Sequence, residues 1–470
     1  MELPEKLKSL KKKNRITLFF PSTNPGISPP LSPPLPNLGI GYIGTVLKTH
    51  GHQVQCVDGN VICPEISVDE HRLGEYVLEK SLRTIRHTKP DILGVGSWTT
   101  NFPFAAELIS SYAKKHPNRL IVLGGYQATF LPELVFRLLP QVDVLVCGEG
   151  EHTMLELIEA VEKGVSLDRV KGIAYRDGKR IVKTPPRDLI RDLNELPFID
   201  YDLFVGFDPA KAAGLMILTS RGCPFNCVFC SCKAFWRNIR TRSVENIVEE
   251  IRRLRDRYAI ESFGVCDDLF SVNRKRVLEF CEMLGRERMH MNWTFNARID
   301  TLDGSVIEAL RCSGVSRICL GLESVNIRTL RYIGEKHPEQ YADTARKLLK
   351  LCVSRQVPCK FSTIVGFPNE TEEEIQYMLD FVAKARSKGV HIYTGLPVCY
   401  PGTRLWDLYR RKEISLTRIK DDNLRRHSSG FFAEKYEHLP ECVPSAWMIE
   451  NSHVASDRIE EMLRDHRSGA

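Results

Sequence analysis

The sequence twice alternates short runs of β-branched and aliphatic residues with helical patterns, and this rhythm restricts the fold more than any other feature. Strands that alternate with helices pair in parallel, with helices on both faces of the sheet. The first series therefore predicts a doubly wound, Rossmann-like α/β domain over residues 1–180, which binds its ligand at the carboxyl edge of the sheet. Its strands are expected to begin at Arg15, Gln53, Asp91, Arg119 and Val142, followed by a hairpin in GIAYRDGKRIV that turns at Asp177 and Gly178.

A second series of strand–helix units begins at Leu215 and continues to HIYTGLP, which ends at Pro397. Six such units predict a partial (βα)6 barrel over residues 212–411, whose chemistry gathers at the carboxyl ends of the strands. We interpret the proline-punctuated, acidic segment 181–211 as the linker between the two domains. Residues 412–470 form a C-terminal extension with no readable pattern.

Composition excludes several classes of protein. The chain is 43% hydrophobic and 27% charged, as in ordinary globular proteins. No segment approaches the roughly 18 uninterrupted apolar residues of a membrane span, and we expect a cytoplasmic protein whose fifteen cysteines are thiols or metal ligands. The net charge of +7 suits an anionic small-molecule substrate, but no basic stripe with interleaved aromatic residues indicates nucleic acid as a partner.

The stretch RGCPFNCVFC places Cys223, Cys227 and Cys230 at spacings of four and three, directly after the first barrel strand. An iron–sulfur cube normally takes four thiolates. Three would leave one iron open, and an open coordination position marks a catalytic rather than a structural metal. The alternatives are packed core thiols or a structural zinc knuckle with Cys232 as its fourth ligand.

This motif, with Phe229 before its last cysteine, resembles the signature of the radical S-adenosylmethionine (SAM) superfamily over residues 212–410. The resemblance implies a [4Fe-4S] cluster whose fourth iron is chelated by SAM, an external electron donor such as flavodoxin or ferredoxin, and a 5′-deoxyadenosyl radical. It implies further SAM contacts from barrel strands: Asp267 and Asp268 to the amino group, Arg298 to the carboxylate, Glu323 to the ribose, and the backbone from Ile364 to Gly366 to the adenine. Ordinary explanations stay open, since either aspartate or Glu323 can cap a turn or helix and Arg298 can pair with Asp300.

The stretch GIGYIG, residues 39–44, matches a dinucleotide-binding fingerprint, and Asp58 closes the next strand as a ribose-binding acid would. In that fingerprint the first glycine immediately follows the first strand, whereas here a proline-rich loop of about 18 residues intervenes. We therefore interpret these glycines as positions where the helix packs closely on the sheet.

The better match for this series is a second resemblance. The proline-rich loop, NLGIGYIG, DILGVGS, LGGYQAT and CGEGE resemble the cobalamin-binding domain that precedes some radical SAM domains, over residues 15–165. The resemblance implies that cobalamin lies along the carboxyl edge of the sheet, on three loops. The loop residues implied are Ser97, Trp98, Thr99, Gly124, Gly125, Tyr126, Gln127, Glu149 and Gly150. The DxHxxG motif that places a histidine below cobalt is absent, so Trp98 or Thr99 is expected beneath the ring, and a relic domain without cofactor is the alternative.

The two resemblances together imply a cobalamin-dependent radical SAM enzyme, in most such enzymes one that methylates an unactivated carbon of a small molecule or natural product. The same scaffold also supports cyclisation, rearrangement or elimination, with or without cobalamin. A non-enzymatic metal- or corrinoid-binding module would have no use for Arg298, Glu323 or six barrel units. The remaining cysteines show no spacing of a second cluster, which argues against the methylthio-transferring tRNA enzymes.

Overall fold

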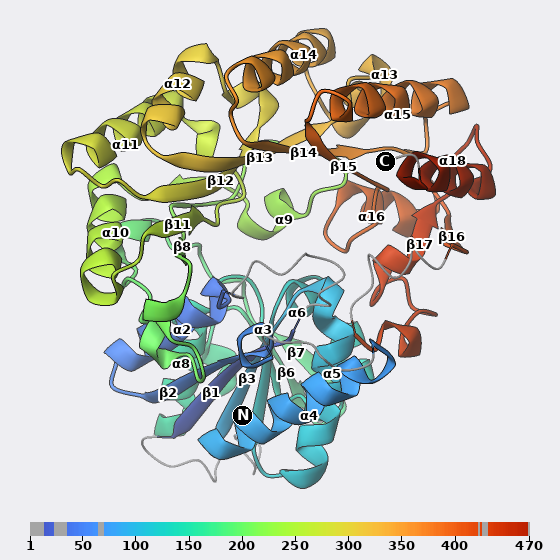
Figure 1. The fold of residues 1–470 in the computed structure, drawn as a ribbon. Coiled ribbons are helices and arrows are strands. Elements are labelled where there is room, and N and C mark those ends of the chain that lie inside the picture. The colour runs from blue at the N-terminus through green and yellow to red at the C-terminus, as the bar shows by residue number, and fades with distance from the viewer. Residues whose placement is uncertain (1–13, 23–34, 64–69, 422–423, 425–430, 469–470) are drawn as a thin grey trace. The chain divides into compact units, whose positions relative to one another are not determined.

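The computed structural model describes residues 14–22, 35–63, 70–421, 424 and 431–468. Contacts within the chain divide it into two compact units (Figure 1). The first unit comprises Met1–Ala212 and Arg426–Pro444, and the second comprises Ala213–Arg425 and Ser445–Ala470. Most of the proline-rich loop, residues 23–34, lies outside the described residues. No helix among those described is long and apolar enough to span a bilayer.

The first unit is built on a seven-stranded sheet with the order β2-β1-β3-β4-β5-β6-β7. Strands β1 to β5 are parallel, and β6 and β7 form the antiparallel hairpin expected from GIAYRDGKRIV. The doubly wound prediction is therefore confirmed. In such sheets ligands lie where the strand order reverses, here between β1 and β3. The strands are β1 (Arg15–Phe20), β2 (Gln53–Asp58), β3 (Ile92–Ser97), β4 (Leu120–Gly125), β5 (Val144–Val146), β6 (Ile173–Asp177) and β7 (Arg180–Lys183).

Helices cover both faces of this sheet because successive residues of a strand point to opposite faces. Leu18 faces one side, near Met154, since both side chains border Gly94. Its neighbour Phe19 faces the other side, where its ring stacks 6.3 Å from that of Phe104. The helices are α2 (Leu38–Thr49), α3 (Gly59–Ile62), α4 (Glu70–Thr88), α5 (Phe102–Lys115), α6 (Tyr126–Phe130), α7 (Pro132–Leu138) and α8 (Glu151–Lys163).

Part of the C-terminal extension packs on the first unit, which the sequence did not indicate. The rings of Phe431 and Phe432 lie 6.1 Å and 5.8 Å from Phe104 of α5. Lys435 pairs with Glu107 of the same helix at 2.7 Å. The rest of the extension, β16 (Leu416–Arg418), β17 (Trp447–Ile449) and α18 (Ser456–Ser468), belongs to the second unit. The segment 181–211, interpreted as a linker, lies within the first unit.

The second unit is a six-stranded parallel sheet with the order β15-β14-β13-β12-β11-β8. Figure 1 shows this sheet curved, with α10, α11, α12, α14 and α15 along its outer side. All six expected strands are present, and the partial barrel is confirmed. The strands are β8 (Leu215–Ile217), β11 (Ser262–Val265), β12 (Asn292–Arg298), β13 (Val315–Glu323), β14 (Cys359–Ile364) and β15 (His391–Gly395), with a small pair β9 (Ser220–Arg221) and β10 (Arg240–Thr241).

The barrel helices begin and end where local chemistry directs. In α10, Ser243 caps the first turn by accepting from Asn246 N–H, the apolar positions recur at helical spacing, and Ala259 ends the helix with φ 54°. In α15, Thr371 and Glu374 form a reciprocal capping box. The barrel helices are α9 (Cys232–Trp236), α10 (Val244–Tyr258), α11 (Arg274–Arg286), α12 (Gly304–Cys312), α13 (Ile327–Ile333), α14 (Pro338–Ser354), α15 (Glu372–Arg386) and α16 (Arg404–Arg410).

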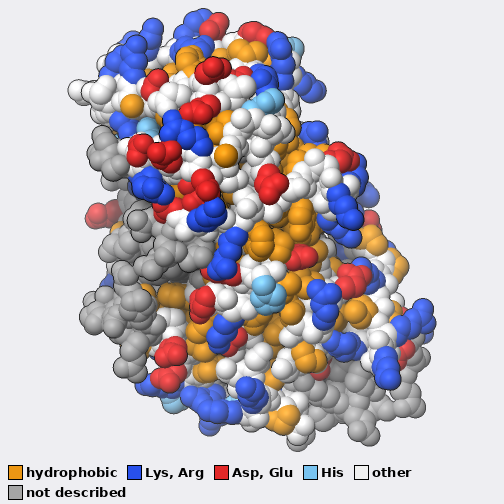
Figure 2. Space-filling view, turned by 90° about the vertical axis from the view of Figure 1, so that its right-hand side faces the viewer, with side chains coloured by type: hydrophobic (Ala, Val, Ile, Leu, Met, Phe, Trp, Pro, Cys, Tyr) orange, Lys and Arg blue, Asp and Glu red, His pale blue; other side chains and the backbone are white. Residues whose placement is uncertain are grey.

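The described surface is mixed in charge. On the face shown in Figure 2, basic and acidic side chains are interspersed, with apolar side chains between them. Several exposed ion pairs of the described residues lie within one helix, as Lys163 does with Glu159 at 2.7 Å. Exposed pairs of this kind add little stability.

Candidate functional site

The three-cysteine loop leaves the short strand β9 and is held by backbone hydrogen bonds at Val228. Gly222 has φ +89°, and a Cβ there would lie 2.6 Å from the carbonyl oxygen of Asn238, so only glycine fits. Within the loop, Val228 N–H donates to the Ile333 carbonyl at 3.0 Å, and Leu405 N–H donates to the Val228 carbonyl at 3.0 Å. The loop is thus fastened to α13 and α16, which both follow barrel strands.

Cys230 and Cys232 interact within this loop. The thiol of Cys232 donates to the sulfur of Cys230, and this bond lowers the pKa of Cys230 against the effect of burial. Across the described residues, no three His, Cys, Asp or Glu side chains converge as the ligands of a single metal ion do. Cys232 is buried beside Cys230.

The adjacent aspartates at the end of β11 have different partners. Asp267 is 1% exposed, and its two carboxylate oxygens accept from the N–H and hydroxyl groups of both Thr219 and Ser220. It is fully engaged in holding the strand that leads into the cysteine loop. Asp268 instead accepts from Gly222 N–H at 3.1 Å. Of the two, only Asp268 lies against the cysteine loop itself.

Arg298, the last residue of β12, contacts the cysteine loop directly. Its Nη1 lies 3.8 Å from Sγ of Cys227, and its Cζ lies 3.8 Å from the ring centre of Phe225. Its Nε and Nη2 donate to Asp300 at 2.7 Å and 3.2 Å, and Nη2 also bonds to Glu335. Burial raises the pKa of Cys227 to about 12, and the nearby guanidinium acts to lower it.

Glu323 ends β13 in an unusual backbone conformation. Its φ is +57°, and the pairing with β14 shifts register between Gly321 and Glu323. The carboxylate folds back to within 2.6 Å of the place where a Gly321 Cβ would stand, so that glycine makes room for it. Burial raises the pKa of Glu323 to about 7, while Arg298 acts to lower it. Strained residues of this kind are concentrated at functional sites.

The end of β14 approaches the cysteine loop through aromatic packing. The ring of Phe229 lies 6.1 Å from that of Phe367. Gly366, two residues after Ile364, has φ +92°, and its N–H donates to Glu370 at 2.6 Å. Glu370 is fully buried and also accepts from Phe367 N–H at 2.9 Å, so it fixes the turn on which the predicted adenine contacts depend.

In the first unit, the loop after β3 lies at the switch point of the sheet. Asn101 organises this loop: its Oδ1 accepts from Trp98 N–H at 2.8 Å, and its Nδ2 donates to the Pro21 carbonyl at 3.3 Å. Ser97 and Thr99 are buried, whereas Trp98 remains 45% exposed with its ring edge-on to Phe20 at 5.0 Å. The indole is therefore the large apolar group that this loop presents.

The loop after β4 brings the backbone close to its neighbours. Gly125 has φ +97°, and a Cβ there would lie 2.3 Å from the carbonyl oxygen of Ser97. Gln127 is 0% exposed; its Nε2 donates to the Glu441 carbonyl at 3.0 Å, but its Oε1 has no partner among the described residues. Gly124 and Tyr126 are half-buried beside them. A buried acceptor without a donor costs free energy unless a ligand or water satisfies it.

The loop after β5 and the glycines of α2 are used in packing. Glu149 accepts from Ile190 N–H at 2.8 Å, which ties the segment after β7 to this edge. A Cβ at Gly150 would lie 2.6 Å from Ile43, and one at Gly44 would lie 2.7 Å from Sγ of Cys56. The interpretation of the GxGxxG stretch as a helix–sheet packing motif is thus supported by the structure.

Two family models match the chain: the radical SAM superfamily over residues 217–382, and the B12 binding domain over residues 31–158. An uncharacterized methyltransferase of Pyrococcus horikoshii is 33% identical over 410 residues, which cover 86% of this chain and 84% of the relative. The chain belongs to the cobalamin-dependent radical SAM family. Its cofactors are accordingly a [4Fe-4S] cluster, SAM and cobalamin, and the two recognised resemblances are confirmed.

Two further comparisons bear on this family member. The anaerobic magnesium-protoporphyrin IX monomethyl ester cyclase of Cereibacter sphaeroides is 30% identical over 309 residues, and the match spans 63% of this chain but only 50% of the cyclase. The structure of the radical SAM methyltransferase TsrM from Kitasatospora setae, with tryptophan and a SAM analogue bound, has a TM-score of 0.71 at 14% identity, covering 97% of this chain and 88% of TsrM. At that identity the likeness shows a shared fold.

The residues present fit the cofactors of the family. Cys223, Cys227 and Cys230 are half-buried thiols on one short loop, which suits a cluster with one iron left for SAM. In the first unit, the unpartnered Oε1 of Gln127 and the exposed ring of Trp98 suit cobalamin, because its corrin carries amide donors around an apolar ring.

Several residues that shape the site were not singled out from the sequence. Asn101, Glu335 and Glu370 each hold a loop at the carboxyl end of a strand. They lie 80, 37 and 4 residues from the partners they hold. The only available signal was the polarity of residues that follow a strand, and many exposed loops share it.

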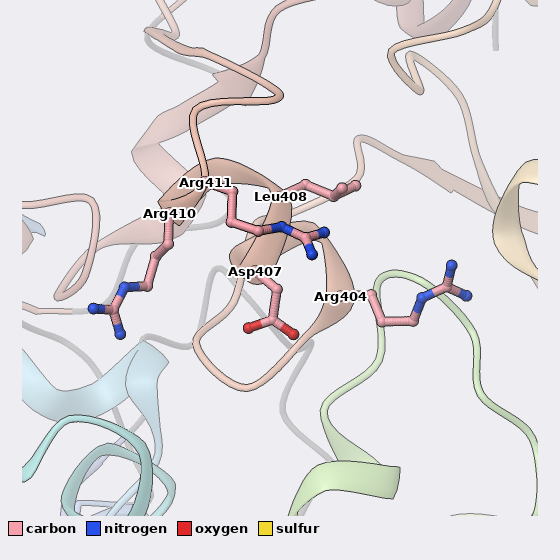
Figure 3. Close-up of a pocket in the computed structure, with 5 residues that line it drawn as sticks. All are labelled: Arg404, Asp407, Leu408, Arg410 and Arg411. Carbon is pink, nitrogen blue, oxygen red and sulfur yellow. The ribbon is translucent and has the colours of Figure 1, made fainter.

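A hollow of about 620 Å³ lies beside α16, which follows the last barrel strand. Its described lining is Arg404, Asp407, Leu408, Arg410 and Arg411. Figure 3 shows Arg410 and Arg404 extending to opposite sides, with the carboxylate of Asp407 between them. Arg411 also pairs with Glu413 at 2.8 Å. This lining therefore carries more guanidinium groups than carboxylates.

Proposed function

We propose that this enzyme methylates an unactivated carbon of a small molecule, with Cys223, Cys227 and Cys230 as the cluster ligands. The observation that carries the proposal is the three-thiol loop at the carboxyl end of a partial barrel, in a chain that also has a B12-type unit. When bound, the cluster and SAM supply the one-electron chemistry that activates the carbon, and cobalamin supplies the methyl group. The relative from Pyrococcus horikoshii, matched over 84% of its length, is named as a methyltransferase, which supports methyl transfer.

The protein's own part is to hold and orient these groups. Gly222, Val228 and Asp268 fix the cysteine loop. Glu323 provides an acceptor beside the cysteines for the ribose of SAM, and the backbone from Ile364 to Gly366 would lie against the adenine. The rings of Phe229 and Phe367 pack together beside this backbone.

In the first unit, we propose that Trp98 lies against the corrin and that Gln127 accepts from one of its amides. Gly125 lets this loop pack closely on the end of β3, because its missing Cβ leaves room for the Ser97 carbonyl. Asn101 keeps the Trp98 loop in register with the loop after β1. The corrinoid would therefore be held by shape and by a few neutral hydrogen bonds.

We place the enzyme in the cytoplasm, supported by its fifteen free cysteines, with flavodoxin or ferredoxin as its electron donor. The charge of the hollow beside α16 supports an acidic substrate. The alternative reaction is cyclisation, which the similarity to the magnesium-protoporphyrin cyclase favours. It fits less well because half of the cyclase's length has no counterpart in the match.

An assay without substrate separates these functions. The protein is reconstituted without oxygen with iron, sulfide and hydroxocobalamin, reduced, and given SAM with a deuterated methyl group. Methyl transfer predicts that the label reaches the corrinoid and that S-adenosylhomocysteine is released in equal amount. Cobalt bound in stoichiometric amount, with 5′-deoxyadenosine as the sole product from SAM, would contradict methyl transfer and favour cyclisation or rearrangement.

A further inference from the structure

We propose that Arg298 binds the cluster rather than the SAM carboxylate: it donates an N–H to the sulfur of Cys227 and thereby stabilises the reduced cluster. The inference depends on the assignment of Cys227 as a cluster ligand and concerns a property that the methyl-transfer proposal leaves open. Arg298 is in this sense a positioning residue, which acts on the cofactor through one of its thiolates.

Each nitrogen of the Arg298 guanidinium already has a hydrogen-bond partner. Nε and Nη2 form a bidentate pair with Asp300 at 2.7 Å and 3.2 Å, and Nη2 also bonds to Glu335. The remaining nitrogen, Nη1, lies 3.8 Å from Sγ of Cys227, within the range of an N–H···S hydrogen bond. A carboxylate such as that of SAM is best bound by two parallel N–H groups. A guanidinium offers two such pairs of N–H groups, Nε with Nη2 and Nη1 with Nη2. In Arg298, Nη2 already bonds to Asp300 and Glu335, so neither pair is free for the SAM carboxylate.

Packing fixes the guanidinium in this orientation. It lies between the rings of Phe225 and Tyr341, with Cζ 3.8 Å and 4.9 Å from the two ring centres. The side chain is 13% exposed, and Glu335 beside it is 10% exposed. Tyr341 is anchored in turn, because its hydroxyl donates to the Gly321 carbonyl at 3.1 Å. Turning Arg298 toward another ligand would break both carboxylate bonds and expose Phe225.

Such a contact bears on the redox state of the cluster. Reduction adds one negative charge, which is shared by the cluster and its thiolates. Hydrogen bonds to the sulfurs stabilise that charge and raise the reduction potential. Asp300 and Glu335 offset the positive charge of Arg298, so the effect comes from the directed N–H···S bond rather than from net charge.

The test compares Arg298→Lys and Arg298→Gln with the wild type, each reconstituted and shown to hold iron and cobalt. Lysine keeps the charge but cannot hold Asp300, Glu335 and Cys227 together, since it lacks the planar fork. An EPR-monitored potentiometric titration should show the equilibrium constant for cluster reduction falling about tenfold in both variants, a shift of about 59 mV for one electron. Binding of SAM, followed by its effect on the EPR signal of the reduced cluster, should stay within about twofold.

Arg274→Gln is the matched control. Arg274 pairs with Asp303 at 2.9 Å in the same unit, near the same end of the barrel, but it is exposed. It should leave the potential unchanged. An unchanged potential with weakened SAM binding in the Arg298 variants would overturn the proposal and assign Arg298 to SAM. Loss of iron in both variants would also overturn it, since Arg298 would then be needed for cluster assembly. A wild-type protein that holds iron but transfers no methyl group would contradict the proposed function alone.

Discussion

The side chains at the carboxyl ends of the strands differ in character between the two units. The barrel edge is charged: Asp268, Arg298 and Glu335 bond to the cysteine loop or to one another. The edge of the first unit offers an exposed indole at Trp98, and at Gly125 the chain packs closely against Ser97 of the neighbouring strand β3. We therefore expect cluster binding to depend on directed bonds from charged side chains, and corrinoid binding to depend on apolar contact.

The largest expected effect is at the barrel edge. Cys227→Ala should abolish cluster assembly, because only two thiolates remain for a cube that uses three. Iron and acid-labile sulfide should fall to background after anaerobic reconstitution, with cobalt binding retained because the thiol belongs to the other unit. Cys232→Ala is the control and should keep about four irons per chain. If Cys232→Ala lost the cluster as well, the division of roles within this loop would be wrong.

At the edge of the first unit, Gly125→Ala should lower the free energy of unfolding by more than about 3 kcal/mol. An alanine is strained at φ +97°, and its Cβ would collide with Ser97. The midpoint temperature of thermal unfolding and the amount of bound cobalt should both fall, while the iron content of the barrel should not change. Gly164→Ala serves as control: it too has positive φ, at +67°, but opens onto free space. Its cost should be about 1 kcal/mol. Equal costs at the two glycines would refute the crowding argument.

Asp58, at the end of β2, should make the first unit sensitive to pH. Burial raises its pKa from 3.8 to about 6. Because the folded pKa lies above the unfolded value, the group stabilises the fold below about pH 4, and this contribution is lost as the pH rises to about 6. The difference corresponds to about 3 kcal/mol. Thermal midpoints of the apoprotein between pH 4 and 7 should therefore vary less in Asp58→Asn.

A carboxylate with the opposite shift provides the control for that measurement. Hydrogen bonds from Arg15 outweigh burial and lower the pKa of Asp91. Its contribution is present above the unfolded pKa and lost as the pH falls, so Asp91→Asn should reduce the loss of stability in acid. If the pH dependence of stability were the same in Asp58→Asn and wild type, the claim that burial raises the pKa of Asp58 would be wrong.

The smallest expected effect is on the ring contact of the first unit. Trp98→Ala should weaken hydroxocobalamin binding about tenfold, or about 1.4 kcal/mol, because it removes one large apolar group. Stability should change little, since the side chain is 45% exposed. Tyr393→Ala, in the barrel unit and 63% exposed, is the control and should leave corrinoid binding unchanged. Equal binding by Trp98→Ala and wild type would place the ring elsewhere on this edge.

The fold was readable from the sequence because its signals are local. Strand runs such as that beginning at Arg15, the hairpin turn at Asp177 and Gly178, and the spacing of Cys223, Cys227 and Cys230 each lie within a few residues. The partners of the site were less readable. Sequence reasoning paired Arg298 with SAM or with Asp300; the structure shows the pair with Asp300 and adds Glu335 and Cys227.

The sequence by itself determined the parallel α/β architecture, the three-thiol loop and the family, because periodicity and motif spacing are properties of short segments. Tertiary structure decided which of two adjacent aspartates lies against the cysteine loop, and it left the amide oxygen of Gln127 buried without a partner. It also packs Phe431 and Phe432 against Phe104 of α5, more than 300 residues away in the chain. These contacts join residues that are far apart in the sequence and come together only when the chain folds. Patterns within short segments therefore do not predict them.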